Sequence, residues 1–342
     1  MKRFLSILFF ILPSVFLLPL PRAVFAATIT PLILEVEAEP GQTVQRFVAV
    51  YNETDSDLYL SAGVETFEPR GERGEVRLLS PELSGAATGW VKLADNSLVL
   101  KPNQTAQVPV IFAIPKIADV GGYYLAVMWQ FGGAPQRLGS QVNLAGRVGT
   151  LVLLTVKGEV KEDLALKEFK LSADNWRAPF WPWLDSLLIK NQVLNSSQVD
   201  FFSRLENLGS VHLKPQGYII IKNIFGRVVA SLPFNSENGN ILPQSIRSWA
   251  GSWSPPNVFS GRWAVLNNLF SWRGGFYQAQ LKLEYGENRK ILSSMTLSFW
   301  LLPLKFLLLV GGVVILILLM IILRFRRMIK SKKITANQIP KS

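Results

Sequence analysis

Along most of the chain, apolar residues recur at every second position in short runs that end at Gly, Pro, Asn or Asp. From Leu58 to Val64 the apolar side chains alternate with Tyr, Ser and Gly, and from Val108 to Ile114 four apolar side chains fall on one face. A period of two is that of a half-buried β-strand. Apart from Trp183 to Gln192, no stretch before residue 300 keeps a helical period of 3.6. The pattern therefore predicts an all-β body.

The predicted strands fall into two groups. In the first half they cover residues 33–38, 44–51, 58–64, 108–114, 123–131 and 150–156, and in the second half residues 164–171, 199–206, 217–221, 227–232, 276–285 and 291–299. Pro40-Gly41 and Pro102-Asn103 supply turns between strands of the first half. The charged stretch 157–163 lies between the groups and is typical of a short linker.

A short internal repeat supports two related units. Gly121–Ala126 (GGYYLA) resembles Gly274–Ala279 (GGFYQA), and each precedes the last strand or strands of its half. In immunoglobulin-like sandwiches, a Tyr near the start of the penultimate strand commonly closes the adjoining corner. The sequence therefore predicts two immunoglobulin-like β-sandwich domains, residues 27–157 and 158–299, with aromatic-rich insertions in the second.

Residues 1–26 have the three parts of a secretory signal peptide. Lys2 and Arg3 form a basic start, an apolar stretch runs to about Leu20, and short side chains at Val24 and Ala26 suit a signal peptidase. We expect cleavage after Ala26, with an uncleaved signal anchor as the alternative. The chain contains no cysteine, so it forms no disulfide and has no thiolate metal site.

A second apolar segment lies near the C-terminus. Residues 306–323 are uncharged and mostly aliphatic, and as a helix they would span ~27 Å, close to the hydrocarbon thickness of a bilayer. The sequence predicts a transmembrane helix with its outer flank over residues 300–323. Its flanking anchors are aromatic or basic: Trp300, Lys305, Arg324, Arg326 and Arg327.

The charge distribution sets the predicted topology. The chain has 36 Lys and Arg against 24 Asp and Glu, and seven of the bases lie in residues 324–342, behind the apolar segment. By the positive-inside rule, this basic tail is cytoplasmic and the body is extracellular, as in a single-pass type I cell-membrane protein. The tail is typical of a stop-transfer sequence, with specific lipid or nucleic-acid binding as the alternative.

Three stretches of the first half stand out together: Leu34–Asn52, Leu98–Gln104 leading into Val108–Pro115, and Gly122-Tyr123-Tyr124. These stretches carry a resemblance to the first domain of the WxL-interacting cell-surface proteins of Gram-positive bacteria. It implies a signal peptide, two β-sandwich domains and a C-terminal membrane helix with a basic tail, and binding to a cell-wall polymer and a partner surface protein. The second half departs from the family in its two aromatic-rich insertions and in Leu205–Ile224.

The chain offers little material for catalysis. His212 is the only histidine, and it follows a turn, where a histidine usually bonds a nearby carbonyl group. Without cysteine, one histidine makes a zinc site only with several carboxylates. The acidic run Asn52–Asp57 lacks the Gly and closing Glu of a calcium hand, so a solvated turn is favoured. We therefore expect no enzyme activity, catalytic residue, cofactor or metal.

Two aromatic-rich segments, residues 174–185 and 249–272, are the candidate ligand-binding sites. Both are predicted to be loops, because neither alternates as a strand. Three interpretations stay open: the loops pack together as a satellite core, rest on the outer leaflet, or form a platform for a sugar or peptide. The candidate ligand-binding residues are Trp176, Trp181, Trp183, Trp253, Trp263 and Trp272.

These features predict a non-catalytic, membrane-anchored extracellular protein that binds a cell-envelope polymer or another surface protein. Besides that glycan or protein partner, it contacts membrane lipid through one helix, and it binds no nucleic acid. Pairing along an exposed sheet edge is one way to hold a partner, because sandwiches have open edges. The alternative is a membrane-tethered scaffold or chaperone-like assembly factor for a surface protein complex.

Overall fold

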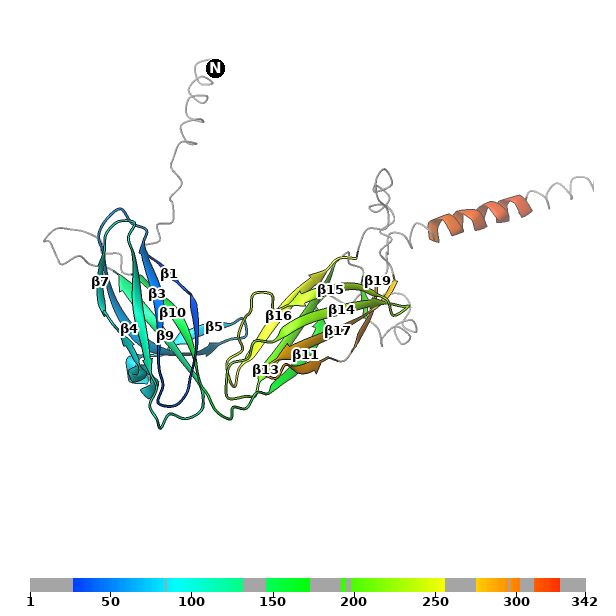
Figure 1. Ribbon diagram of the computed structural model, residues 1–342. Coiled ribbons are helices and arrows are strands. Elements are labelled where there is room, and N and C mark those ends of the chain that lie inside the picture. Colours follow the sequence, from blue (N-terminus) through cyan, green and yellow to red (C-terminus); the bar gives the residue numbers. More distant parts are fainter. Residues whose placement is uncertain are drawn as a thin grey trace, which may run out of the picture. The chain divides into compact units, whose positions relative to one another are not determined.

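The computed structural model describes residues 27–83, 85–131, 146–172, 192–194, 198–255, 275–294, 296–301 and 311–326. The predicted signal peptide lies outside these residues. The chain divides into two compact units, residues 1–68 with 76–160, and residues 69–75 with 161–342, so the division falls close to the predicted linker. Each unit is built on a pair of β-sheets (Figure 1).

The first unit packs a four-stranded sheet against a six-stranded one. In the first sheet the order is β1 (Ala27–Thr30), β3 (Thr43–Asn52), β8 (Thr105–Ala113) and β6 (Val91–Leu93). In the second it is β2 (Ile33–Ala38), β10 (Gly146–Val156), β9 (Gly121–Phe131), β4 (Leu58–Arg70) and β5 (Glu75–Leu78), and β7 (Ser97–Leu100) pairs with β4. Two short 3-10 helices, Pro81–Leu83 and Ala86–Trp90, lie between β5 and β6.

The core of the first unit lies between its sheets and follows the alternating pattern of the sequence. On β8, Val108, Val110 and Phe112 are at most 2% exposed, whereas the residues between them are half-buried. The other sheet contributes the same pattern from its two central strands, through Leu125, Val127, Trp129, Val152, Leu154 and Val156. The period-two prediction is therefore confirmed for these strands.

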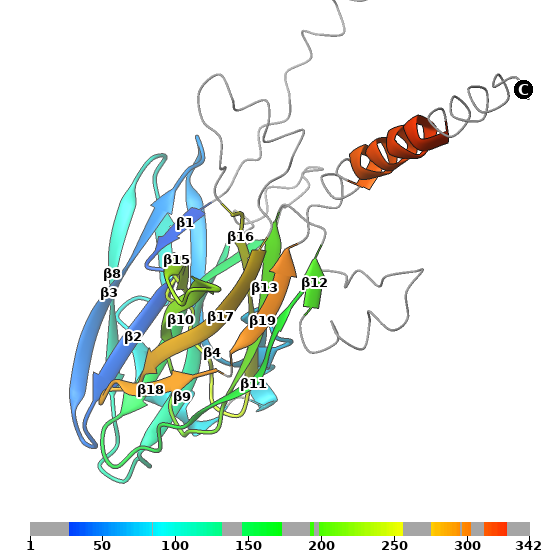
Figure 2. The same ribbon diagram turned by 90° about the vertical axis from the view of Figure 1, so that its right-hand side faces the viewer.

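The second unit has two sheets of its own. The first has the order β11 (Leu164–Leu171), β13 (Val199–Asn207) and β16 (Ile246–Trp253). The second has the order β12 (Gln192–Leu194), β19 (Leu297–Leu301), β17 (Gly275–Tyr285), β14 (Gln216–Asn223) and β15 (Val228–Phe234), and β18 (Lys290–Ser293) pairs with β17 (Figure 2).

The two units follow the same path. The order β1-β3-β8 of the first unit corresponds to β11-β13-β16 of the second, and β2-β10-β9-β4-β5 corresponds to β12-β19-β17-β14-β15. In each unit the first strand, β1 or β11, belongs to one sheet, and the next strand, β2 or β12, belongs to the other. This next strand pairs in parallel with the last strand of its unit, β2 with β10 and β12 with β19. The internal repeat predicted from two short motifs thus extends to three strands of the smaller sheet and five strands of the larger one.

A buried asparagine marks the same place in both units. Asn52 ends β3 and Asn207 ends β13, and both side chains are 0% exposed. The Asn52 amide donates to the carbonyl groups of Ser56, Leu100 and Lys101, at 2.8 to 3.0 Å, and its Oδ1 accepts from the Thr54 backbone N–H. The Asn207 amide donates in the same way to Val211 and Ile241, and its Oδ1 accepts from the Gly209 N–H. Each asparagine therefore joins a turn to the neighbouring strand connection.

Replacing either asparagine by alanine leaves several buried backbone groups without their partner. We expect Asn52→Ala and Asn207→Ala each to cost roughly 3 kcal/mol of unfolding free energy, in their own unit only. Hydrogen exchange read by mass spectrometry checks this: Asn52→Ala should deprotect β3 and β8, and Asn207→Ala should deprotect β13 and β16. Asn96→Ala, at an exposed position, is the control and should change little. Uniform deprotection of both units by either variant would contradict the local role.

Two strand predictions for the second unit were wrong in detail. The predicted strand 291–299 is interrupted: the Leu281 N–H donates to the Ser294 hydroxyl at 2.8 Å, and the pairing with β17 stops at Ser293, the end of β18, and resumes at Leu297, the start of β19. Residues 249–253 were assigned to a loop but belong to β16, where they pair with β13. Trp249 and Trp253 share the inner face of this strand with Arg247 and Gly251, so that face did not read as an apolar alternation.

Near the C-terminus, residues 311–326 form a helix whose side chains are almost all exposed. It overlaps the predicted membrane segment 306–323, whose first five residues lie outside the described part of the chain. Within the described residues, no helix meets the length and hydropathy of a membrane span. The membrane anchor therefore stays a prediction.

Candidate functional site: the open edge of β10

Strand β10 is paired along its whole length on one side and along only part of it on the other. All of Gly146–Val156 pairs with β9. On the opposite side, β2 begins to pair at Leu151 and continues to Val156. Among the described strands, none lies on that side of residues 146–150. Within the described residues, the first half of β10 is therefore a sheet edge.

The backbone groups that this edge presents follow from the register. The Leu151 N–H points away from β9 and donates to the Leu32 carbonyl group at 2.9 Å. In an antiparallel pair, alternate residues direct their N–H and C=O groups to the same side. The backbone N–H and C=O groups of Arg147 and Gly149 consequently point away from β9, on the same side as the Leu151 N–H. An extended peptide could extend β2 along the same line with backbone hydrogen bonds.

The side chains around the edge are arranged on two faces. Val148 packs against the core, and Thr150 is buried and donates through its hydroxyl to the Pro31 carbonyl group at 2.8 Å. On the other face, the Arg147 guanidinium forms an ion pair with Glu65. Gly149 has no side chain here, and a Cβ would run into the Met128 sulfur. An added strand would thus meet apolar side chains inside and one charge pair outside.

The tyrosine corner predicted for the first unit is present. Tyr123 lies near the start of β9, and its hydroxyl donates to the carbonyl group of Asp119, four residues upstream, at 2.9 Å. Its ring packs edge-on against Trp90, with ring centroids 4.6 Å apart. Burial raises the pKa of Tyr123, and the nearby charge of Asp119 acts in the same direction. This corner fixes the start of β9, and the start of β9 pairs with the end of β10.

Tyr123→Phe removes one hydrogen bond and should lower the unfolding free energy of the first unit by about 1 kcal/mol at neutral pH. Because the folded-state pKa of Tyr123 is raised, its contribution is fully present below the unfolded pKa of about 10 and is lost as the pH rises through the folded pKa. Denaturant unfolding at pH 7, 10 and 11 measures this. Equal losses of stability in the wild type and in Tyr123→Phe above pH 10 would contradict the assignment.

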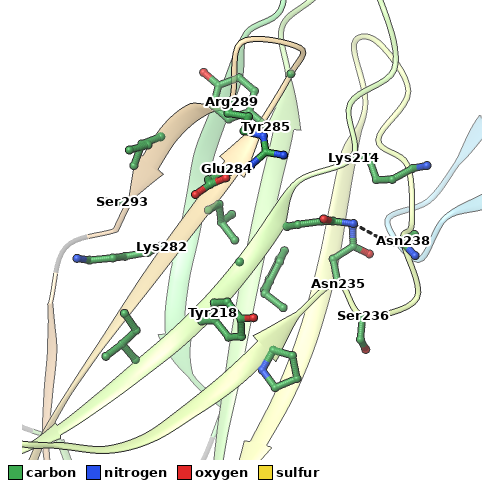
Figure 3. A pocket seen from close by; sticks show the side chains of 18 residues that line it. Lys214, Tyr218, Asn235, Ser236, Asn238, Lys282, Glu284, Tyr285, Arg289 and Ser293 are labelled. Carbon is green, nitrogen blue, oxygen red and sulfur yellow. Dashed lines mark hydrogen bonds between the residues drawn. The ribbon is translucent and has the colours of Figure 1, made fainter.

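A groove of about 770 Å³ lies on the outer face of the second unit, over β14, β15, β17 and β18. Figure 3 shows Tyr218 on this face, with Lys214 and Asn238 on one side and Glu284 and Arg289 on the other. The Gln216 amide donates to Asn238 and ties one wall together. The groove carries charges of both signs and is broadly open, so it selects no single class of ligand.

Most of the predicted ligand-binding tryptophans lie outside the described residues: Trp176, Trp181, Trp183, Trp263 and Trp272. Trp253 is described and is only 5% exposed. Its ring packs edge-on against Tyr277 and Phe299, with centroids 5.1 and 6.5 Å away. Trp253 therefore belongs to the core of the second sandwich, and its indole is not presented to a ligand.

The predicted anchor flanks are partly described. Trp300 is half-buried on β19 and packs against Phe276, with ring centroids 5.2 Å apart. Arg324 and Arg326 lie on exposed positions of the helix 311–326, and Lys305 and Arg327 lie outside the described residues.

His212 is half-buried between the buried side chains of Val211 and Leu213. Leu213 forms an isolated β-bridge with Ile241, which fixes this segment as part of the fold. Within the described part of the chain, no three His, Asp or Glu side chains come together as metal ligands would. No metal-binding residues can be assigned there.

Comparisons with known proteins give structural likeness alone. No protein-family model matches the chain, and no curated protein matches it. Similar solved structures include the class 5 fimbriae chaperone CfaA, with 12% identity over 81% of this chain and 99% of that one and a TM-score of 0.37. The E. coli chaperone DraB has 10% identity over 80% and 95%, with a TM-score of 0.31.

A chain of the Salmonella enterica SafA pilin and SafB chaperone complex is also similar, with 9% identity over 82% of this chain and 98% of that one and a TM-score of 0.33. With TM-scores below 0.5, these likenesses assign neither a partner nor a mechanism to this chain.

Proposed function

We propose that this chain is a membrane-tethered, non-catalytic assembly factor that holds a segment of another surface protein by strand addition to β10. The observation that carries the proposal is the side of residues 146–150 on which no described strand pairs, where the backbone groups of Arg147 and Gly149 face outward in line with β2. Backbone hydrogen bonds would supply affinity, and the apolar surface beside Val148 would select the side chains of the added strand.

The polymer-binding alternative depends on exposed tryptophan. Trp253, the one candidate that the structure describes, is buried in the core. Strand addition, by contrast, requires a free row of backbone groups, and a polysaccharide has no peptide groups to match them. The geometry therefore favours a protein partner over a glycan.

A photo-crosslinking residue at Arg147, in the full chain in its native membrane, tests the class of partner. We expect a discrete covalent adduct that is digested by protease and is resistant to glycan hydrolases. The matched control carries the same residue at Lys92, an exposed position on the edge strand β6 of the other sheet. An adduct that is shortened by glycan hydrolases, or equal adducts at both positions, would contradict the proposal.

Proline at position 147 separates the backbone role from the side-chain role. Arg147→Pro removes an outward N–H that β9 does not use, so the fold should survive. Arg147→Ala removes the ion pair with Glu65 but keeps this N–H. The photoreactive residue is moved to Leu32, which is 71% exposed beside the edge. We expect recovery of the crosslinked partner to fall at least tenfold in Arg147→Pro and to stay near wild type in Arg147→Ala. Equal recovery in both variants would mean that no strand is added here.

The membrane tether is the second part of the proposal, and it is supported by the apolar segment 306–323 with the basic tail behind it. A lysine at the centre of a membrane helix costs about 2.5 to 3.5 kcal/mol of insertion free energy. Ile315→Lys should therefore shift the chain from the carbonate-washed membrane fraction toward the soluble fraction. Lys332→Ala, in the tail, should not. Full release of the wild-type chain by carbonate would refute the tether.

A further inference from the structure

The turn between β14 and β15 exposes two large apolar side chains. Ile224 is 62% exposed and Phe225 is 89% exposed. The turn is nonetheless well bonded: the N–H groups of Phe225 and Arg227 donate to Oδ1 of Asn223, at 3.1 and 3.0 Å. The Asn223 N–H donates to the Arg227 carbonyl group at 2.9 Å. The backbone thus holds Phe225 outward, where water gives it no favourable partner.

This turn lies at the end of the sheet from which the chain leaves. In register, Asn223 is opposite Tyr277, and Gly275, at the start of β17, is opposite Leu301, the last residue of β19. Only β17 separates β14 from β19, so the turn lies ~10 Å to the side of that exit at ordinary strand spacing. Figure 1 shows β14, β15 and β19 meeting at this end.

The chain between the sandwich and the predicted membrane segment is short. Five residue steps join Leu301 to Phe306, and a fully extended chain covers at most ~18 Å in five steps. If residues 306–323 span the bilayer, this end of the second unit lies within that distance of the outer leaflet. The exposed pair Ile224 and Phe225 is then close enough to reach lipid.

The chemistry around the turn suits a membrane interface. Lys222 and Arg227 flank the apolar pair and can extend their charged groups to lipid phosphates while their stems follow the apolar surface. At the same end, Phe276 packs against Trp300, and tryptophan favours the headgroup region. Along the same face of β17, the side chains become more polar away from this end, in the order Phe276, Gln278, Gln280, Lys282 and Glu284.

We infer that the β14–β15 turn inserts Ile224 and Phe225 into the outer leaflet of the membrane that anchors the chain, with Lys222 and Arg227 at the level of the headgroups. This inference rests on the membrane tether of the proposed function. The second sandwich would then contact the bilayer at two points, the exit after Leu301 and the turn, which would restrain its rotation on the short connection.

The absence of cysteine makes a direct test possible, because a single introduced cysteine carries the only label. The full chain is reconstituted in vesicles of phosphatidylcholine and phosphatidylglycerol, with an environment-sensitive fluorophore at Ile224→Cys. Ile291→Cys is the matched control: Ile291 is 76% exposed on the same sheet, and its register partner Glu284 lies at the far end of β17. Val314→Cys reports on the helix.

We expect lipids with a shallow nitroxide to quench the label at 224 at least threefold more than the label at 291, and aqueous iodide to show the reverse order. Adding Phe225→Ser to Ile224→Cys should reduce the lipid quenching. Deep nitroxide should quench the label at 314. If 314 is quenched and 224 behaves like 291, the inference is overturned and the tether stands. If 314 is not quenched by lipid, the tether fails and the inference fails with it.

Discussion

A strand that changes sheets cannot keep the same neighbour along its length, and this constraint determines the architecture of both units. The first segment of each unit pairs with one sheet through β1 or β11 and with the other through β2 or β12. The last strand therefore has a parallel partner for only its second half. In the first unit the consequence is the open edge of residues 146–150, so the same crossover that closes the sandwich also leaves its candidate binding edge free.

The buried asparagines explain how two sequences with little similarity keep one path. Asn52 and Asn207 each satisfy carbonyl groups of a turn and of a distant connection, which would otherwise be buried without a partner. Near each lies a residue with a left-handed backbone, Asn103 with φ of 59° and Gln244 with φ of 56°. Their N–H groups donate to the carbonyl groups of Asn52 and Asn207, respectively. The polar network is thus retained while the apolar residues around it vary.

The strands of the first unit could be predicted from sequence because their two faces differ in burial, so that alternation is visible from Leu58 to Val64 and from Val108 to Ile114. Prediction was weaker where the inner face mixes aromatic, charged and glycine residues, as in β16, or where a side chain interrupts pairing, as at Ser294. The open edge could not be assigned, because alternation gives no information on which neighbour a strand lacks. The tryptophan count was misleading for Trp253, since aromatic residues serve cores as well as binding surfaces.

The parallel pairings also set the order of events during synthesis. Ile33 pairs with Leu151, residues that are 118 apart in sequence (151 − 33), and Gln192 pairs with Phe299, residues that are 107 apart (299 − 192). Contacts at such separations form late and make folding slow, because the loop entropy is lost before the contact is gained. Each sandwich can close only when its final strand has been synthesised. Until then, β9 or β17 has an unsatisfied edge of its own, which is open to pairing with other chains.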